Sequence, residues 1–334
     1  MSLGANDVMG MVPDSADGPS QRVGLVRAGA ARFSEANFDE TLQKLRFAGS
    51  VNTKVVTFAE LREIVGGQAP SVRAVVFHTG RCGSTLLMKM LGHDRSVLPV
   101  GEPAAVGGLH RYALAAPEHA PATYRAIDDI VVLLDRFAAF RRQRSVLKLA
   151  SWETAGVAGL GAVVGEDVPV VVLHRPAEEV VASEIHSPPG WFDWMSGDRG
   201  WLAAWAPYVA RLPSSASPEE IYGAVWASVV EAALALPTKR ALFVSYADLV
   251  TRPSEALGAI ASHIGAASWD CTGALSELSY YSKSASPDRF DPAKRHARPP
   301  LGGGALELVR DIVGDLPGRL CERDLVQSAT KETV

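Results

Sequence analysis

The stretch FHTGRCGSTLL, residues 77–87, decides how this sequence folds. It follows an apolar, β-branched run at residues 72–78, whose lack of polar alternation is typical of a strand covered on both faces of a parallel sheet. After the glycines, residues 86–91 read LLMKML, a run that favours a helix. A strand, a tight glycine turn and a helix in this order aim backbone N–H groups and the positive end of the helix dipole at one point, and such a point binds phosphate.

The side chains of this loop also suit an anion. Gly80 and Gly83 permit backbone conformations and a close approach that a side chain would block, whereas Ser84, Thr85 and Arg81 add hydroxyl donors and a forked positive charge. The loop that binds ATP or GTP reads G-x-x-x-x-G-K-S/T, and its Gly-Lys pair is missing here. The pattern therefore disfavours a nucleoside triphosphatase, and the remaining alternative to an anion site is a glycine turn without a ligand.

Further strands and helices alternate along the chain. We predict strands at residues 145–149, 168–174 and 241–245, and helices at residues 38–47, 58–65, 127–143, 152–164, 176–186, 221–236 and 254–264. Strands that alternate with helices at this spacing form a parallel sheet. The predicted fold class is therefore α/β, with a central parallel sheet flanked by helices.

The chain divides into a short lead-in and one large domain. Residues 1–35 are rich in Gly, Ser, Asp and Ala, which predicts a flexible N-terminal segment before a single domain at residues 36–334. Within that domain we expect a nucleotide-binding core at 72–186, a Trp-rich insertion at 187–220 and the C-terminal part of the core at 221–300. The insertion is either a lid or acceptor wall, or a second small core filled by tryptophans.

Composition narrows the functional classes. Lys and Arg number 33 against 37 Asp and Glu, a net charge of −4, which argues against a nucleic-acid or anionic-membrane binder. The apolar runs are too short to insert in a membrane, and the N-terminus lacks the pattern of a signal peptide. Three widely spaced cysteines, Cys82, Cys271 and Cys321, indicate neither a disulfide framework nor a metal site. We therefore expect a cytoplasmic protein, whose oligomeric state the sequence does not indicate.

Two segments resemble signatures of the sulfotransferase family. The loop at residues 77–87 is similar to the family's 5′-phosphosulfate loop, in the arginine-bearing form of carbohydrate, tyrosylprotein and bacterial sulfotransferases. Residues 170–183, VVVLHRPAEEVVAS, resemble the second signature, in which an arginine (here Arg175) and a serine eight residues on (Ser183) hold the 3′-phosphate. Arg175 would also leave the carboxyl edge of a parallel strand, where ligands of open α/β sheets gather. A surface ion pair of Arg175 with Glu178 or Glu179 is the alternative.

A third, softer likeness lies at residues 244–250, VSYADLV, whose counterpart in the family is mainly structural. Together these segments imply the sulfotransferase version of the P-loop nucleotide-triphosphate-hydrolase fold. They also imply transfer of a sulfonate from 3′-phosphoadenosine 5′-phosphosulfate to a hydroxyl or amine acceptor, with no metal required. The cofactor-binding residues implied are Gly80, Arg81, Cys82, Gly83, Ser84, Thr85, Arg175, Ser183 and Lys283.

The resemblance also implies catalytic roles. Arg81 would neutralise charge on the phosphosulfate, and Lys148, at the end of the strand predicted at 145–149, corresponds to a lysine that assists the leaving oxygen in tyrosylprotein enzymes. Ser282, like Lys283, would contact the phosphates where the family closes over the nucleotide. The alternative for Lys148 is a plain exposed lysine.

Glu102 is the predicted base. It lies twenty-one residues beyond Arg81, where glutamate-using relatives carry a Gly-Glu pair, and partial burial would raise its pKa to a value suited to proton abstraction. A solvated turn glutamate is the alternative, and His110 and His186 are the reserve bases.

The acceptor is left open between small molecules, carbohydrates and peptides. Two other functions stay open as well: a phosphotransferase or kinase on the same sheet, and a non-catalytic nucleotide-binding relative.

Overall fold

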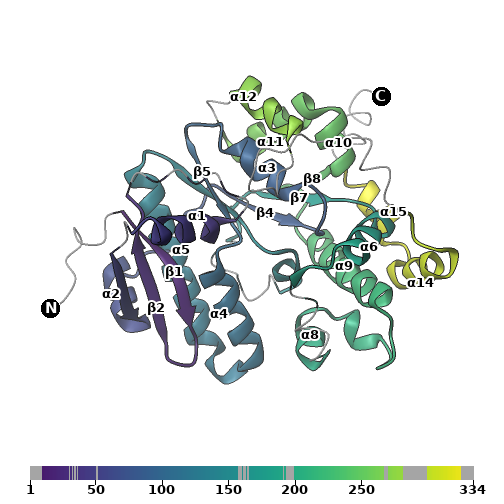
Figure 1. Ribbon diagram of the computed structural model, residues 1–334, viewed down its shortest axis with the longest axis horizontal. Helices are drawn as coiled ribbons and strands as arrows, with labels where there is room; N and C mark the ends of the chain where they lie inside the picture. The colour runs from purple at the N-terminus through teal and green to yellow at the C-terminus, as the bar shows by residue number, and fades with distance from the viewer. Residues whose placement is uncertain are drawn as a thin grey trace.

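Within the described residues of the computed structural model, five parallel strands form the central sheet in the order β5-β6-β4-β7-β8 (Figure 1). The structure describes residues 10–29, 31, 33, 35, 37–49, 52–156, 160, 163, 165–190, 192, 199–266, 270–280 and 299–324. Helices flank the sheet on both sides (Figure 1). The predicted α/β fold with a central parallel sheet is confirmed.

Four of these strands lie where the sequence predicts them, namely β4 (Ala74–His78), β6 (Arg144–Lys148), β7 (Val170–His174) and β8 (Ala241–Ser245). The fifth, β5 (Val97–Gly101), was not predicted. It contains Pro99. Proline has no N–H to donate to a neighbouring strand, so it is rare in central strands and tolerated in edge strands. β5 is an edge strand, paired only with β6 in this sheet, so the proline is tolerated there.

Successive residues of β4 face opposite layers of the fold. Ala74 and Val76 pack in a cluster with side chains of α3 (Ser84–Leu91) and α11 (Pro253–Ile264), whereas Val75 and Phe77 pack in a larger cluster with α5 (Ala120–Phe140). Every residue of β4 is buried. This double cover explains the apolar run without polar alternation in the sequence.

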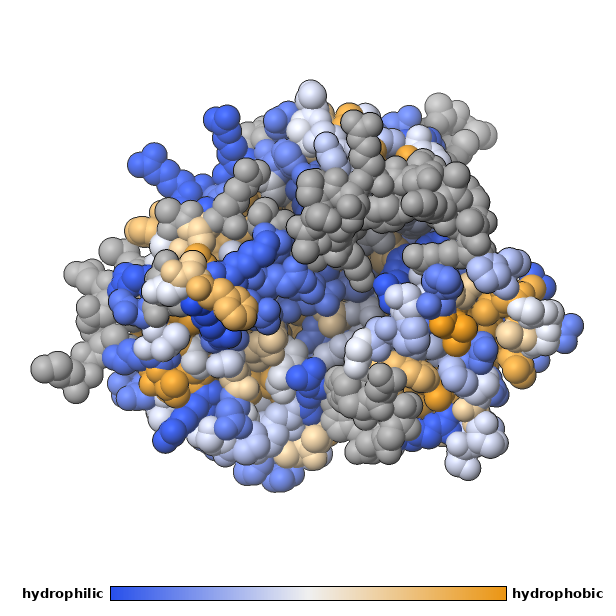
Figure 2. All heavy atoms as spheres, viewed as in Figure 1, coloured by the Kyte–Doolittle hydropathy of each residue, from blue (hydrophilic) through white to orange (hydrophobic). Residues whose placement is uncertain are grey.

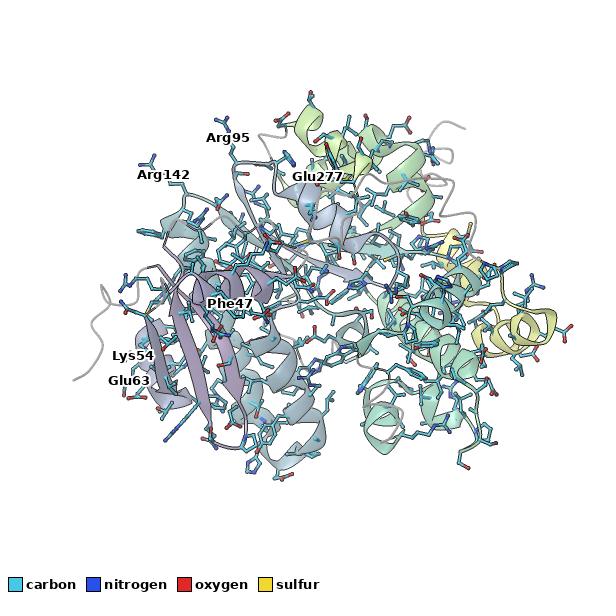
Figure 3. All side chains as sticks on the ribbon, in the orientation of Figure 1. Phe47, Lys54, Glu63, Arg95, Arg142 and Glu277 are labelled. Atoms are coloured by element: carbon cyan, nitrogen blue, oxygen red, sulfur yellow. The ribbon has the colours of Figure 1, made fainter. Side chains whose placement is uncertain are left out.

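The remaining described helices are α1 (Phe38–Phe47), α2 (Phe58–Val65), α4 (Ala104–Ala115), α6 (Ala177–His186), α8 (Arg199–Trp205), α9 (Pro218–Leu234), α10 (Tyr246–Thr251), α12 (Cys271–Ser276), α14 (Gly303–Val313) and α15 (Leu316–Cys321). In α1 and α2 the predicted bounds are confirmed. Thr57 begins α2 through a reciprocal capping box with Glu60. Phe47, at the end of α1, is exposed and extends into solvent rather than joining the apolar face (Figure 3).

A second, antiparallel sheet occupies the N-terminal part of the chain. Its strands are β1 (Met11–Asp17), β2 (Arg22–Arg27) and β3 (Thr53–Thr57), and β1 packs against α4 and α5. Residues 11–27 are thus a β-hairpin, in contrast to the flexible segment predicted for residues 1–35. The hairpin nevertheless has buried apolar side chains, which are few among the Gly, Ser, Asp and Ala of residues 1–35: Met11, Val12, Val23, Leu25 and Val26.

Two other predictions differ from the structure or gain detail from it. The segment predicted as a helix at 152–164 begins instead with a 3-10 turn, η2 (Ser151–Thr154). In the described part of the Trp-rich insertion, Trp205 packs against Trp152 with ring centroids 5.4 Å apart, in a small apolar cluster with Val209 and Ile221. Trp205 thus belongs to a small apolar core, as one of the two alternatives for the insertion predicts, and not to a ligand-binding wall.

Hydrophilic side chains gather near the middle of one face of the molecule, beside α1 (Figure 2). Among the described residues, no helix combines the length and the apolar character that crossing a bilayer requires. The division of residues 36–334 into one domain stays a prediction.

Candidate active site

The loop between β4 and α3 turns through three residues with positive φ. Gly80 and Gly83 both have φ 80°, and Arg81 between them has φ 46°. Gly83 is the residue before the first turn of α3, and a Cβ added to it would lie 2.8 Å from the ring of Tyr246. The turn therefore requires glycine at position 83 both for its backbone conformation and for its packing.

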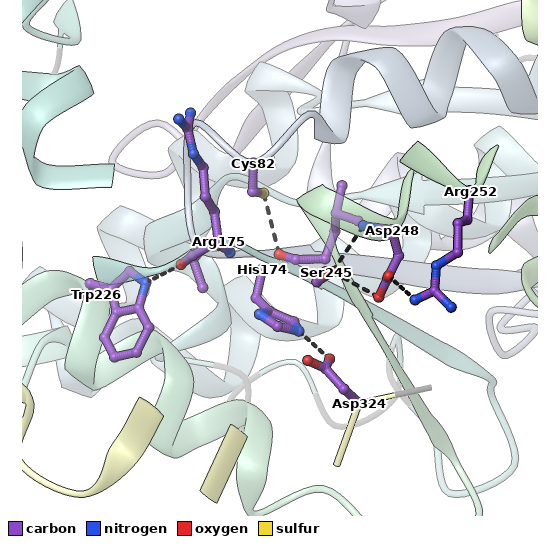
Figure 4. Close-up of polar contacts among 10 residues, drawn as sticks. Cys82, His174, Arg175, Trp226, Ser245, Asp248, Arg252 and Asp324 are labelled. Atoms are coloured by element: carbon purple, nitrogen blue, oxygen red, sulfur yellow. Dashed lines mark hydrogen bonds and ion pairs between the residues drawn. The ribbon is translucent and has the colours of Figure 1, made fainter. Parts of the chain in front are cut away.

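The loop offers backbone and hydroxyl donors where α3 begins. The first N–H groups of a helix have no partner within it, so those of Ser84 and Thr85 point back toward the loop. Cys82 is buried, its thiol donates to the carbonyl of Leu173 at 3.3 Å (Figure 4), and burial raises its pKa to about 11. The Cys82 thiol is therefore not available as a thiolate near neutral pH.

The side chain of Arg81 is tied to α6. Its Nε lies 3.0 Å from Oε2 of Glu184, and its Nη2 donates to the carbonyl oxygen of Ser187. Glu184 is buried and directly follows Ser183, which is itself 2% exposed. The two predicted signatures are thus joined in space by Glu184, a residue that no sequence pattern pointed out.

Arg175 also contacts the loop. Its Nη1 donates to the carbonyl of Arg81 at 3.1 Å, its guanidinium lies 5.1 Å from the centroid of the Tyr246 ring, and its own carbonyl accepts from Trp226 Nε1 at 3.0 Å (Figure 4). Its Nε lies 2.7 Å from Glu179 Oε2. The ion pair weighed as an alternative is therefore present, together with the predicted placement beside the loop.

Lys148 and Glu102 form a pair at the carboxyl ends of β6 and β5. Lys148 is completely buried, and its Nζ lies 2.7 Å from Oε1 of Glu102. The N–H of Glu102 donates to the carbonyl of Lys148 at 2.7 Å, and Glu102 adopts φ 47° to make this turn. Lys148 is thus not a plain exposed lysine, and Glu102 is a turn residue whose side chain is 32% exposed and pairs with that buried ammonium.

The raised pKa predicted for Glu102 is wrong. Burial alone would raise it, but the Lys148 ammonium and His78 outweigh burial and hold the pKa well below its usual range. Nε2 of His78 lies 3.5 Å from Glu102 Oε1, and the N–H of Gly80 donates to His78 Nδ1 at 3.2 Å. A neutral His78 therefore carries its proton on Nε2, facing the carboxylate.

A second carboxyl group lies close to this pair. Glu153, in η2, is 2% exposed and accepts from the N–H of Ala150 at 2.5 Å. Burial raises its pKa to about 8, and the negative charge of Glu102 adds to the rise. Two neighbouring carboxyl groups thus have pKa values that are pushed in opposite directions.

The reserve histidines do not take the place of Glu102. His110 is fully buried, stacks on Trp152 with ring centroids 5.9 Å apart, and has a pKa that burial lowers to about 4. His186 is exposed at the end of α6. The histidine beside the Glu102 carboxylate is His78, the last residue of β4. Ser282 and Lys283 lie outside the described residues.

Comparison with known proteins adds a likeness of fold. No protein-family model matches the chain, and no curated protein matches it. The solved structures that resemble it include three sulfotransferases or sulfotransferase domains. The sulfotransferase domain of the Synechococcus PCC 7002 olefin synthase does so with TM-score 0.41 and 17% identity, covering 75% of this chain and 97% of its own. The sulfotransferase domain of the curacin biosynthetic pathway has TM-score 0.45 and 15% identity, covering 73% and 98%.

The third is a sulfotransferase from Mycobacterium tuberculosis H37Rv, with TM-score 0.39 and 17% identity over 86% of this chain and 88% of that one. At such identities and TM-scores these likenesses assign no activity to this chain.

The first prediction concerns the turn at Gly83. Gly83→Ala should destabilise the fold by about 1–2 kcal/mol or more, because alanine is strained at this φ and its Cβ would meet the Tyr246 ring. Urea unfolding measures the change. Gly258→Ala is the matched control, since Gly258 lies within α11 with open space where its Cβ would point. Equal effects of the two substitutions would contradict this account of the turn.

The second prediction concerns Glu153. In the folded protein the pKa of Glu153 is about 8, whereas in the unfolded chain it is near 4.5. Between these pH values the folded state binds more protons than the unfolded state, so the free energy of unfolding decreases as pH rises through this range. The stability of Glu153→Gln relative to the unchanged protein should therefore increase from pH 5 to pH 9. Urea unfolding at both pH values tests this, with Glu178→Gln on the exposed face of α6 as the control. A pH-independent difference would show that Glu153 titrates normally.

Proposed function

We propose that this chain is a sulfotransferase that passes a sulfonate from 3′-phosphoadenosine 5′-phosphosulfate to a hydroxyl or amine acceptor in the cytoplasm, without a metal. The observation that carries the proposal is the pair of Lys148 and Glu102 at the same sheet edge as the anion loop. β6 is the direct neighbour of β4, so a cation for the leaving oxygen and a carboxylate for the acceptor's proton lie beside the loop.

The loop residues fit the donor's 5′-phosphate. The glycines at positions 80 and 83 leave room for a close approach of phosphate oxygens to the backbone, and Arg81 adds a charge-assisted donor. Arg175 and Ser183 are the residues we assign to the 3′-phosphate. For Arg175 this requires an exchange, because its Nε now faces Glu179, whose side chain is about half exposed and easily resolvated. The roles assigned to Ser282 and Lys283 stay part of the proposal.

The reaction that this arrangement favours is an in-line displacement. The acceptor oxygen forms a bond to sulfur while the bond from sulfur to the phosphate oxygen breaks, and the departing electron pair stays on that oxygen. Lys148 neutralises the charge that develops there. Glu102 takes the acceptor's proton.

The proton affinity of Glu102 depends on whether Lys148 is paired with it. While Lys148 lies 2.7 Å from the carboxylate, Glu102 is a weak base, because the ammonium and His78 stabilise its charged form. A donor anion competes for the same ammonium. As Lys148 turns toward the leaving oxygen, the proton affinity of Glu102 rises, so the base gains strength when the donor is bound.

A phosphotransferase on the same sheet is the second candidate, but the Gly-Lys pair that holds terminal phosphates is absent from the loop. Binding separates the two, and it is our third prediction. Adenosine 3′,5′-bisphosphate should bind in the presence of EDTA with unchanged affinity after Mg²⁺ is added, and labelled phosphosulfate should donate to some member of a hydroxyl acceptor panel. Hydrolysis of Mg-ATP in place of bisphosphate binding would overturn the proposal. Binding without any transfer would favour a non-catalytic relative.

The fourth prediction separates the roles of two residues. Glu102→Gln should lower kcat by roughly 10²–10⁴-fold, as expected for removal of a general base, with little change in bisphosphate affinity. Arg175→Ala should instead weaken bisphosphate binding and leave kcat at saturating donor less affected. Calorimetry and single-turnover kinetics measure the two effects.

Glu178→Gln, on the exposed face of α6 near Arg175, is the control. Thermal unfolding shows whether Glu102→Gln destabilises the fold by leaving the buried Lys148 ammonium without its carboxylate partner. Equal loss of affinity and turnover in Glu102→Gln would remove Glu102 as the base.

A further inference from the structure

A pocket that is open to solvent lies between α1, α3 and β5. Its apolar walls come from Phe33, Phe38, Met88 and Pro99, and Phe33 stacks on Phe38 with ring centroids 4.7 Å apart. Gly101 also lines it. One end of the pocket therefore borders the residue that directly precedes Glu102.

The wall formed by α1 is anchored beside the candidate base. The carboxylate of Asp39, in the first turn of α1, accepts from the N–H of Ala104 at 2.7 Å. Ala104 begins α4 two residues after Glu102. The pocket wall and the turn that carries Glu102 are thus held together by a direct hydrogen bond.

The acidic groups of the pocket are already paired. Glu35 lies 2.7 Å from Lys44 Nζ, and Glu277 lies 2.9 Å from His93 Nε2 (Figure 3 shows Glu277 beside α3). Lys44 balances the charge of Glu35, and His93 gives Glu277 a hydrogen-bond partner. Both carboxylates therefore already have partners within the chain.

Two donors in the pocket lack such partners. Lys89 is half-buried on α3, and within the described part of the chain no carboxylate lies within ion-pair distance of its ammonium. Thr41 is 6% exposed, and its hydroxyl oxygen is buried without a hydrogen-bond partner among the described residues. A buried polar group without a hydrogen-bond partner is unfavourable. A ligand that accepts hydrogen bonds from both groups would therefore bind more tightly than one that does not.

We propose that this pocket is the acceptor site, and that it takes a small aromatic hydroxy acid. The inference rests on the proposed sulfotransferase function. The ring lies against the apolar walls, the carboxylate accepts from Lys89 and Thr41, and the hydroxyl lies at the Gly101 end, toward Glu102. An acyl chain would leave both donors unpaired, and a neutral sugar would set its hydroxyl groups against Phe38 and Met88.

The fifth prediction tests this site by binding, without the donor. In the presence of adenosine 3′,5′-bisphosphate, 4-hydroxybenzoate should bind about tenfold more tightly than 4-hydroxybenzamide, the difference expected of a hydrogen bond to a charged group. Isothermal calorimetry measures both affinities. Lys89→Met should abolish the preference for the acid, and Thr41→Val, which keeps the side-chain shape, should reduce it.

Lys239→Met is the matched control, since Lys239 is exposed in the turn before β8 and should leave the preference intact. Equal affinities in the unchanged protein, or a preference that survives Lys89→Met, would overturn the assignment of the site. Thermal unfolding of each variant confirms that it is folded.

Transfer of labelled sulfonate is measured separately. If 4-hydroxybenzoate binds with the expected preference but no sulfonate is transferred to any acceptor, the pocket assignment stands and the proposed function fails. If another acceptor is sulfonated at the same rate by Lys89→Met and by the unchanged protein, the function stands and the pocket assignment fails.

Discussion

The burial of the Lys148 ammonium is the constraint from which the rest of the site follows. A charged group that is removed from water is strongly unfavourable unless an opposite charge accompanies it, and Lys148 is completely buried at the end of β6. Glu102 supplies that charge. To bring it there the chain accepts a positive φ at Glu102 directly after β5, and the N–H of Glu102 closes the turn on the carbonyl of Lys148. The pairing thus determines a backbone conformation as well as a pKa.

The same principle recurs at the phosphate loop. Arg81 faces Glu184 and Arg175 faces Glu179, so each cation assigned to the donor already has a carboxylate partner. Under the proposed function, the donor's 3′-phosphate would take over Arg175 from Glu179. Binding there would be an exchange of an ion pair rather than a new neutralisation, and the displaced carboxylate would be resolvated. Glu179 is about half exposed and can be resolvated, whereas Glu184 is buried and fits better as a group that keeps orienting Arg81.

Local patterns in the sequence predicted much of this fold, and long-range pairings escaped them. The loop, α1 and α2 were predictable because a buried run, a glycine turn and the Thr57–Glu60 capping box each act within a few residues. β5 was missed because Pro99 is tolerated only by virtue of the strand's edge position, which no local pattern reveals. The direction of the Glu102 pKa shift was predicted wrongly because burial was foreseen, whereas the Lys148 ammonium on β6 and the hydrogen-bonding His78 on β4 were not.

No sequence pattern indicated Glu184 or Glu153, because the importance of each comes from long-range contacts: Glu184 with Arg81, and Glu153 with Glu102. Glu153 shows why that matters for the chemistry. Burial raises its pKa to about 8, so near neutral pH this carboxyl group favours its neutral form. An ionised Glu153 would add a second negative charge beside Glu102. Kept neutral by burial, it leaves Glu102 as the ionised carboxylate of the two, and Glu102 is the one that pairs with the Lys148 ammonium. In the proposed reaction, the strength of Glu102 as a base would then depend on whether an incoming anion has replaced it beside Lys148.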